Sequence, residues 1–248
     1  MALVNHDLTL EYQPIFELDS GRKVLTEALV RWRQGGKTVC SPDVFIPIAE
    51  KCGLITPIGE FVIDAAMRCL AGQLETQNYE GRLAINVSPQ QFVCGQSISS
   101  YVEASLNKYR LNGNQICIEI TETTPFIFSD RCARELRRLR ELGVVIYLDD
   151  FASGFLGIRA FVDLEIDGIK LAMKGGKDRA YAPKQQALVK AFWQMCHDLD
   201  LDLIVEGIET AEQIDWLSKF PGLLGQGFHL GCPAGMNELS LRVRVGET

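Results

Sequence analysis

Short apolar runs alternate with longer amphipathic segments along nearly the whole chain, and this alternation constrains the fold most. Strands that alternate with helices favour parallel pairing in a sheet that is covered by helices. We expect strands at residues 8–16, 24–32, 82–88, 115–122, 144–150, 167–171 and 201–207, with a weaker one at 223–228. About eight strands in 248 residues is the size of an α/β protein with a (β/α)8 TIM-like barrel.

Start and stop signals for helices lie between these strands. Ser41 followed by Pro42 begins a helix that ends at Gly53. Further helices are expected over 58–74, from Ser129 to Gly143, from Pro183 and from Thr210. The segment between the first two strands, ELDSGRK, is too short for a crossover helix, so we expect the first strand to be antiparallel. Without a linker or repeat, residues 1–248 are expected to form one domain.

The composition excludes several classes of protein. With 25 basic and 32 acidic residues the net charge is −7, which is unlike a protein that binds nucleic acid polymers through a basic field. The eight cysteines form no Cys-x-x-Cys pair, which disfavours zinc ribbons and thioredoxin-like sites. No signal peptide and no apolar run of about 18 residues is present, so we expect a soluble, cytoplasmic chain without a membrane segment.

Five arginines in residues 131–140 could suggest a surface that binds nucleic acid. Asp130, Glu135 and Glu141 stand at helical spacing to them. We therefore expect a solvated helix face with internal ion pairs instead.

Polar residues fall in or near the ends of the expected strands, and this is the strongest indication of function. They are Glu27, Asn86, Glu119, the pair Asp149 and Asp150, Lys170 and Glu206. Carboxyl ends of barrel strands meet at one face, where clustered carboxylates repel one another unless cations neutralise them. Oxygen ligands favour Mg²⁺ or Mn²⁺ over zinc. Adjacent aspartates suit two ions, as in phosphoryl hydrolysis.

The segment Glu27-Ala28-Leu29, with Arg31, resembles the signature of the EAL domain family, whose members hydrolyse cyclic di-GMP. Further blocks resemble the family in the same order: Tyr12-Gln13-Pro14-Ile15, Asn86-Val87-Ser88, the segment from Ile118 to Glu122, Asp149-Asp150-Phe151, Ile169-Lys170, the segment from Glu206 to Thr210 and Gln226-Gly227-Phe228. The resemblance implies a barrel enzyme of bacterial signalling that converts cyclic di-GMP to linear pGpG with two Mg²⁺ or Mn²⁺ ions. It also implies inhibition by Ca²⁺ and a homodimer.

The resemblance further implies a role for each motif residue. The first ion is expected on Glu27, Asn86, Glu119 and Asp149, and the second on Asp149, Asp150 and Glu206. Lys170 is expected to position the attacking water, with Glu206 and Gln226 completing the catalytic site and Glu122 anchoring a loop. The substrate is expected to contact Gln13, Leu29, Arg31 and Pro233.

Two segments depart from the family pattern. Ala152 stands where the family has a glycine, and Leu156 and Gly157 replace two small polar residues, so metal affinity or regulation is expected to differ. Lys170 is followed by Leu171-Ala172 instead of Ile-Asp, which removes an acidic group beside the expected site.

Other interpretations remain open at this stage. The altered loop fits a domain that binds the dinucleotide, or a partner protein, without hydrolysis. Barrel chemistry alone also allows a metal-dependent lyase or enolising enzyme with Lys170 as base. In structural terms, Lys170 could be a solvated strand end, and Glu206 and Glu209 could cap the helix at Thr210.

Overall fold

The fold is that of a computed structural model, in which residues 7–76, 79–93, 95–121, 129–151, 164–173 and 181–239 are described. The strands are β1 (Leu8–Glu17), β2 (Lys23–Gln34), β3 (Lys37–Cys40), β4 (Arg82–Val87), β5 (Ile116–Thr121), β6 (Val145–Asp149), β7 (Gly168–Ala172), β8 (Asp202–Glu206) and β9 (Leu224–Gly225). The α-helices are α1 (Pro42–Lys51), α2 (Ile55–Glu75), α3 (Pro89–Val93), α4 (Ile98–Tyr109), α5 (Asp130–Glu141), α7 (Pro183–Asp198) and α8 (Ala211–Leu217).

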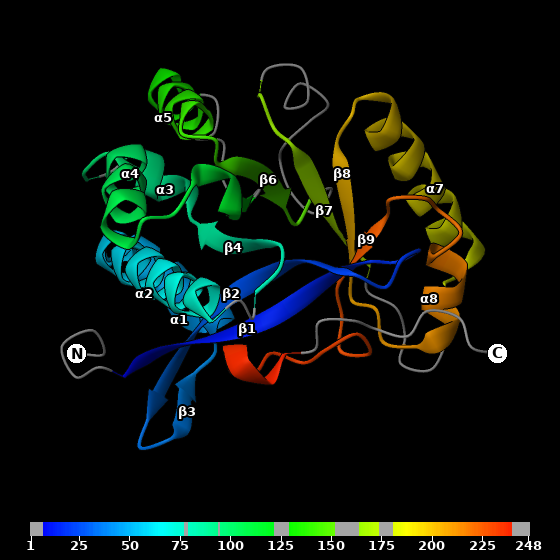
Figure 1. Cartoon of the computed structure of the whole chain (residues 1–248), viewed down its shortest axis with the longest axis horizontal. Helices are drawn as coiled ribbons and strands as arrows, with labels where there is room; N and C mark the ends of the chain where they lie inside the picture. Colours follow the sequence, from blue (N-terminus) through cyan, green and yellow to red (C-terminus); the bar gives the residue numbers. More distant parts are fainter. Residues whose placement is uncertain are drawn as a thin grey trace.

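Eight of the described strands close into a ring in the order β1-β2-β4-β5-β6-β7-β8-β9, with β9 paired back to β1 (Figure 1). The pairings from β2 round to β9 are parallel, whereas β1 runs antiparallel to both of its neighbours. Helices surround the ring, with α1, α2 and α4 on one side and α7 and α8 on the other. The expected TIM-like barrel with an antiparallel first strand is therefore confirmed.

The inside of the ring is built in two layers that lie two residues apart on each strand. The lower layer, called here the floor, is a buried cluster: Ile15, Leu25, Ala84, Cys117, Tyr147, Ile204 and Leu224. Side chains two residues along a strand share a face, so the next inward positions form a second layer. These positions carry polar groups: Gln13, Glu27, Asn86, Glu119, Asp149, Lys170, Glu206 and Gln226. We call this second set the charged layer.

A larger apolar core lies between the ring and its helices. The helix α2, for example, buries Ile63, Ala66, Met67 and Leu70, which recur at helical spacing. No helix among the described residues is long and apolar enough to span a membrane.

Three elements differ from the sequence-based expectation. The strand β3 was not expected; it forms a hairpin with β2 through Gly35 and Gly36, both at positive φ, and projects from the barrel (Figure 1). The helices α3 and α4 were not expected either, although Ser97 caps α4 by accepting a hydrogen bond from the backbone N–H of Ser100.

The solvated face expected for α5 is present, since Arg134, Arg137 and Arg138 are exposed, but the expectation of ion pairs within the helix is wrong. Glu135 is buried and accepts hydrogen bonds from Ser97 Oγ and the backbone N–H of Ser99, both at 2.9 Å. Arg131 donates to the backbone carbonyls of Val93, at the end of α3, and of Gly95, between α3 and α4, and Arg140 donates to Asp167. Within the described part of the chain, no ion pair joins two side chains of α5. Arg131, Glu135 and Arg140 therefore attach the helix to other segments.

Candidate metal and phosphodiester site

Lys170 lies at the centre of the charged layer. Its side chain is 1% exposed, and its Nζ lies 2.7 Å from Glu206, 3.0 Å from Glu119, 3.2 Å from Glu27 and 3.7 Å from Asp149. Burial alone would lower the pKa of Lys170, but these four carboxylates raise it well above its ordinary value. Lys170 is therefore a buried ammonium and not a solvated strand end. A raised pKa also disfavours Lys170 as the base of a lyase.

Glu27, in the middle of β2, has a partner at each carboxylate oxygen. Asn86 Nδ2 donates to Oε1 at 2.6 Å, while Gln226 Nε2 and Lys170 Nζ donate to Oε2 at 2.7 and 3.2 Å. Burial raises the pKa of Glu27, but the charge of Lys170 and these hydrogen bonds outweigh it, so the pKa lies below its ordinary value. Glu27 is held as a carboxylate by the protein itself.

The other carboxylates of the charged layer are less well satisfied. Oε1 of Glu119 is buried and has no hydrogen-bond partner among the described residues. Burial, only partly opposed by Lys170, raises the pKa of Glu119 and Asp149 and brings the pKa of Glu206 to about 7. Their negative charge is thus incompletely compensated by the protein.

Asp149, Asp150 and Glu206 each offer a ligand oxygen, and these oxygens lie within 4.8 Å of one another. The backbone of Asp150 is left-handed, at φ 53°, and its N–H donates to Asp149 Oδ1 at 2.8 Å. A non-glycine residue rarely adopts this conformation, and such outliers concentrate at functional sites. The turn after β6 brings both aspartates next to the end of β8.

This donor set fits hard divalent cations. The ligand atoms offered are carboxylate and amide oxygens, which suit Mg²⁺ or Mn²⁺. Five ionised carboxylates beside the Lys170 ammonium would carry a formal charge of −4, which two divalent ions would balance. The unpartnered oxygen of Glu119 is a further buried acceptor that a cation would satisfy.

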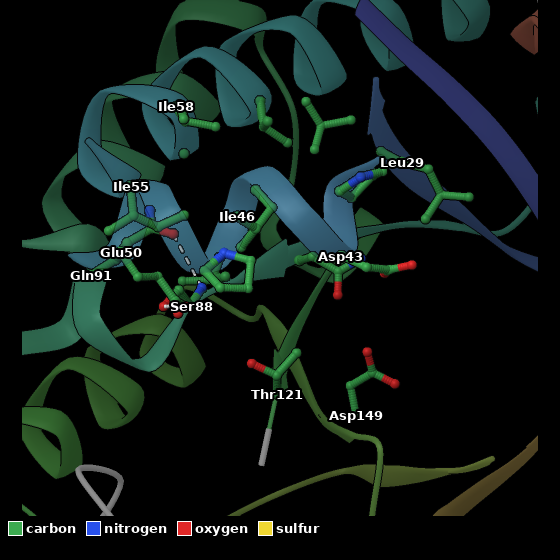
Figure 2. Close-up of a pocket in the computed structure, with 18 of the residues that line it drawn as sticks. Leu29, Asp43, Ile46, Glu50, Ile55, Ile58, Ser88, Gln91, Thr121 and Asp149 are labelled. Carbon is green, nitrogen blue, oxygen red and sulfur yellow. Dashed lines mark hydrogen bonds between the residues drawn. The ribbon is translucent and has the colours of Figure 1, made fainter. Parts of the chain in front are cut away.

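A pocket of about 330 Å³ opens from the charged layer toward α1 and α2. Its walls include Glu27, Leu29, Arg31, Asn86 and Asp149. Figure 2 shows Asp149 and Thr121 on one side and the apolar side chains of Ile46 and Ile58 on the other. The pocket therefore joins an acidic end to an apolar end.

Arg31 lines this pocket but is already engaged on one edge. Its Nε donates to Glu11 at 2.8 Å and its Nη1 donates to the carbonyl of Val30 at 3.1 Å. Glu11 also accepts from Arg33. Glu11 was missed by the sequence analysis; a lone acid in β1 gives no signal until the β1–β2 register, which pairs Glu11 with Leu29, is known.

A second pocket, of about 230 Å³, lies on the opposite side of Glu27. It is lined by Gln13, Glu206, Gln226 and the exposed ring of Phe228, among others. Gln13 donates to the carbonyl of Gly231 and accepts from Gln226. Pro233 lies beside this region, because the next residue, Ala234, pairs with Tyr12 through two backbone hydrogen bonds. Glu27 thus lines both pockets.

The structure brings together most of the residues singled out from the sequence. Glu122 and the altered loop from Ala152 to Gly157 lie outside the described residues. The helix cap proposed for Glu206 and Glu209 is made instead by Thr210 and Gln213, whose side chains bond each other's backbone N–H groups. Ala172 lies at the end of β7, opposite Glu206 in the β7–β8 register.

The chain is similar to known proteins over most of its length. A family model described as the EAL domain matches residues 1–233. The chain is 32% identical over 227 residues to the probable cyclic di-GMP phosphodiesterase PdeB of Escherichia coli, covering 92% of this chain and 43% of that protein. It is 34% identical over 227 residues to a cyclic di-GMP phosphodiesterase of Pseudomonas aeruginosa, covering 90% of this chain and 38% of that protein.

The fold of the chain also matches that of a solved structure. The structure of the PaMucR phosphodiesterase in its c-di-GMP complex superposes with a TM-score of 0.84 at 30% identity, covering 96% of each chain. The chain spans less than half the length of the two curated relatives named above. The match over nearly the whole chain, in both sequence and fold, shows that this chain belongs to the EAL domain family.

Proposed function

We propose that this chain hydrolyses cyclic di-GMP to linear pGpG with two Mg²⁺ or Mn²⁺ ions. The observation that carries the proposal is the convergence of Glu27, Glu119, Asp149 and Glu206, from four different strands, on Lys170. Relatives named as cyclic di-GMP phosphodiesterases, matched over about nine-tenths of this chain, support the choice of substrate.

The residues of the charged layer would divide the work as follows. Glu27, Asn86, Glu119 and Asp149 would hold one ion, and Asp149, Asp150 and Glu206 the other. Bound divalent ions would polarise the scissile phosphate and lower the pKa of the attacking water. Lys170 would keep the carboxylates in place, and its charge would stabilise negative charge that develops on the phosphate. Gln226 would hold Glu27 in the orientation that the ions require.

The two pockets suggest how an elongated dinucleotide would lie. One half would enter the pocket that contains Leu29 and Arg31, and the other half would lie near Gln13, Phe228 and Pro233. One of the two phosphodiesters that join the halves would then lie over Glu27, which lines both pockets. The Nη groups of Arg31 suit a phosphate, because a guanidinium offers several donors in one plane.

The direct test measures conversion of cyclic di-GMP to pGpG by chromatography, with Mg²⁺, with Mn²⁺ and with a chelator. Turnover is expected with either ion and not with the chelator, and Ca²⁺ is expected to inhibit. Glu27→Ala should lower turnover by about 10³-fold. Glu212→Ala, an exposed acid on α8, should leave turnover unchanged.

Failure has two distinct forms in this experiment. No turnover with either ion contradicts the proposed hydrolysis. Tight dinucleotide binding without turnover, in the presence of metal, supports a receptor instead.

We also propose that residues 1–248 act as a single domain and form a homodimer. Light scattering of the purified chain tests the homodimer.

A further inference from the structure

Tyr147 is the one aromatic side chain in the floor of the barrel. It is fully buried, with 0% of its surface exposed, and it heads the fully buried side chains of the described residues by volume. It belongs to β6, two residues before Asp149. Burial, together with the negative charge of Asp202, raises the pKa of the phenol above its ordinary value, so the phenol is a hydrogen-bond donor at neutral pH.

The side chain of Tyr147 crosses from its own strand to the strand after next. Its ring covers Gly168 of β7, where an added Cβ would lie 2.9 Å from Tyr147 Cε1 and 2.8 Å from the carbonyl oxygen of Asp202. Its hydroxyl donates to Asp202 Oδ2 at the beginning of β8. One side chain therefore contacts β6, β7 and β8.

These three strands carry Asp149, Lys170 and Glu206. Asp149 follows Tyr147 by two residues and Lys170 follows Gly168 by two residues, while Glu206 lies at the far end of β8 from Asp202. The described β6–β7 ladder has only two residue pairs. Backbone hydrogen bonds from Phe151 N–H to the Lys170 carbonyl, at 3.0 Å, and from Asp167 N–H to the Ile146 carbonyl, at 2.8 Å, extend this ladder. The contact of Tyr147 with Asp202 adds a side-chain link between β6 and β8, which do not pair with each other.

We propose that Tyr147 is a positioning residue, whose hydrogen bond to Asp202 sets the separation of β6 and β8 and thereby the spacing of the carboxylates of Asp149, Asp150 and Glu206. This inference rests on the proposed function, because it concerns the ion that these three carboxylates would share. The proposed role of Tyr147 depends on two contacts only: its ring lies over Gly168, and its hydroxyl donates to Asp202 below the charged layer.

The test is a calorimetric titration of the full chain with Mn²⁺ alone, together with urea unfolding in a chelator. Tyr147→Phe keeps the ring and removes the hydroxyl, so we expect Mn²⁺ affinity to fall by about tenfold. Asp202→Ala should cause a similar loss. The two changes together should cost little more than either one, because both break the same contact.

Two variants separate positioning from stability. Tyr79→Phe removes another buried hydroxyl, which donates to the carbonyl of Arg82 at 2.6 Å outside the charged layer. Tyr79→Phe should lower the free energy of unfolding about as much as Tyr147→Phe does, and it should leave Mn²⁺ affinity unchanged. Asp202→Asn retains an oxygen acceptor for the phenol and should restore near-normal affinity relative to Asp202→Ala.

The outcomes are distinguishable from failure of the proposed function. If the unmodified chain binds no Mn²⁺, the proposed function fails, and this inference fails with it. If the unmodified chain binds Mn²⁺ and Tyr147→Phe binds it equally well, only the inference is overturned. Equal losses of affinity in Tyr147→Phe and Tyr79→Phe overturn it as well, since they would reflect general destabilisation.

Discussion

Glu27 and Glu206 face the same ammonium from different sides of the barrel, yet their surroundings shift their pKa in opposite directions. Glu27 is surrounded by amide donors from Asn86 and Gln226, and its pKa is lowered. Glu206 contacts Lys170 but lies near Asp149, and its pKa is raised to about 7, chiefly by burial. Burial raises the pKa of both glutamates, and Glu27 is the less exposed of the two, at 7% against 22%. The hydrogen-bond donors around Glu27 therefore account for the opposite direction.

This comparison shows two ways in which the charged layer accommodates negative charge. On the β2 side, hydrogen bonds from the protein stabilise the carboxylate without any ion. On the β6 and β8 side, the carboxylates of Asp149, Asp150 and Glu206 lie close together. Bound cations would favour the ionised forms of Asp149 and Glu206, whose pKa is raised. We expect that removal of divalent cations and changes in pH act mainly on the carboxylates of the β6 and β8 side.

Removal of Lys170 should have the largest effect, because both sides depend on it. Lys170→Met leaves buried carboxylates without their counter-charge, so the free energy of unfolding in a chelator should fall by about 3–5 kcal/mol. Urea unfolding with and without Mn²⁺ measures this, and Mn²⁺ should restore part of the loss.

A second buried lysine provides the matched control for this substitution. Lys23 is 3% exposed, and its ammonium lies 4.6 Å from the ring centroid of Tyr79. Burial lowers its pKa. Lys23→Met should cost about 1 kcal/mol or less. Equal losses for the two lysines would mean that the carboxylates contribute little.

Gln226→Leu should weaken the β2 side selectively. It removes the donor to Glu27 and leaves a buried carboxylate oxygen with fewer partners, so unfolding should become easier by about 2 kcal/mol at neutral pH. Gln73→Leu removes a solvent-exposed hydrogen bond from α2 to Asn237 and should cost clearly less in the same urea titration. An unchanged stability of Gln226→Leu would contradict the role assigned to the amide.

The pH dependence of stability should differ between the two glutamates. In a chelator, Glu206 titrates near pH 7 when folded and near its ordinary value when unfolded. Between these values the folded chain binds more protons, so its stability falls as pH rises, by about 1–2 kcal/mol from pH 5 to pH 7. Glu206→Gln should flatten this slope in urea titrations.

Glu27 should contribute with the opposite sign. Its folded pKa is lowered, so its contribution to stability is present above the ordinary glutamate pKa and is lost as pH falls through the folded pKa. Glu27→Gln should therefore change the pH dependence below about pH 5, where it removes a contribution that grows as pH rises, and leave the slope from pH 5 to pH 7 nearly unchanged. The same slope in both variants would remove the distinction between the two sides.

The smallest effect should come from the backbone of Asp150. Asp150→Ala places alanine at a positive φ and should cost about 1 kcal/mol, whereas Asp150→Asn tolerates that conformation better. Asp200 also lies at positive φ, at 56°, but belongs to the loop before β8. Asp200→Ala should lower the free energy of unfolding in urea by a similar amount and leave Mn²⁺ affinity unchanged. Both Asp150 variants should weaken Mn²⁺ binding.

Much of the ring could be predicted from the sequence, because apolar runs bounded by turns are typical of buried strands. The antiparallel first strand followed from the short ELDSGRK segment. The helix α4 was missed although Ile98, Val102 and Leu106 recur at helical spacing after Ser97, a pattern that the intervening polar residues dilute. The strand β3 is short and mostly exposed, so it has no apolar period to detect.

The members of the charged layer were predictable, but their relations were not. Residues that end strands are recognisable one at a time, and family motifs supplied their roles. The contact of Lys170 with Glu27 spans 143 positions along the chain, so only the closed ring reveals it. The same holds for Tyr147 and Asp202, which in the sequence are ordinary members of two apolar runs.

Closure of the ring between β1 and β9 has a consequence for biogenesis. The first strand of the barrel finds its last neighbour only when residues 224–225 have left the ribosome. Until then Glu27 cannot accept the hydrogen bond from Gln226, and the acidic residues of the nascent chain lie on a sheet whose strands are incompletely paired. Pairing of strands so distant in sequence is slow, so the complete charged layer forms only after β9 has been synthesised and not strand by strand.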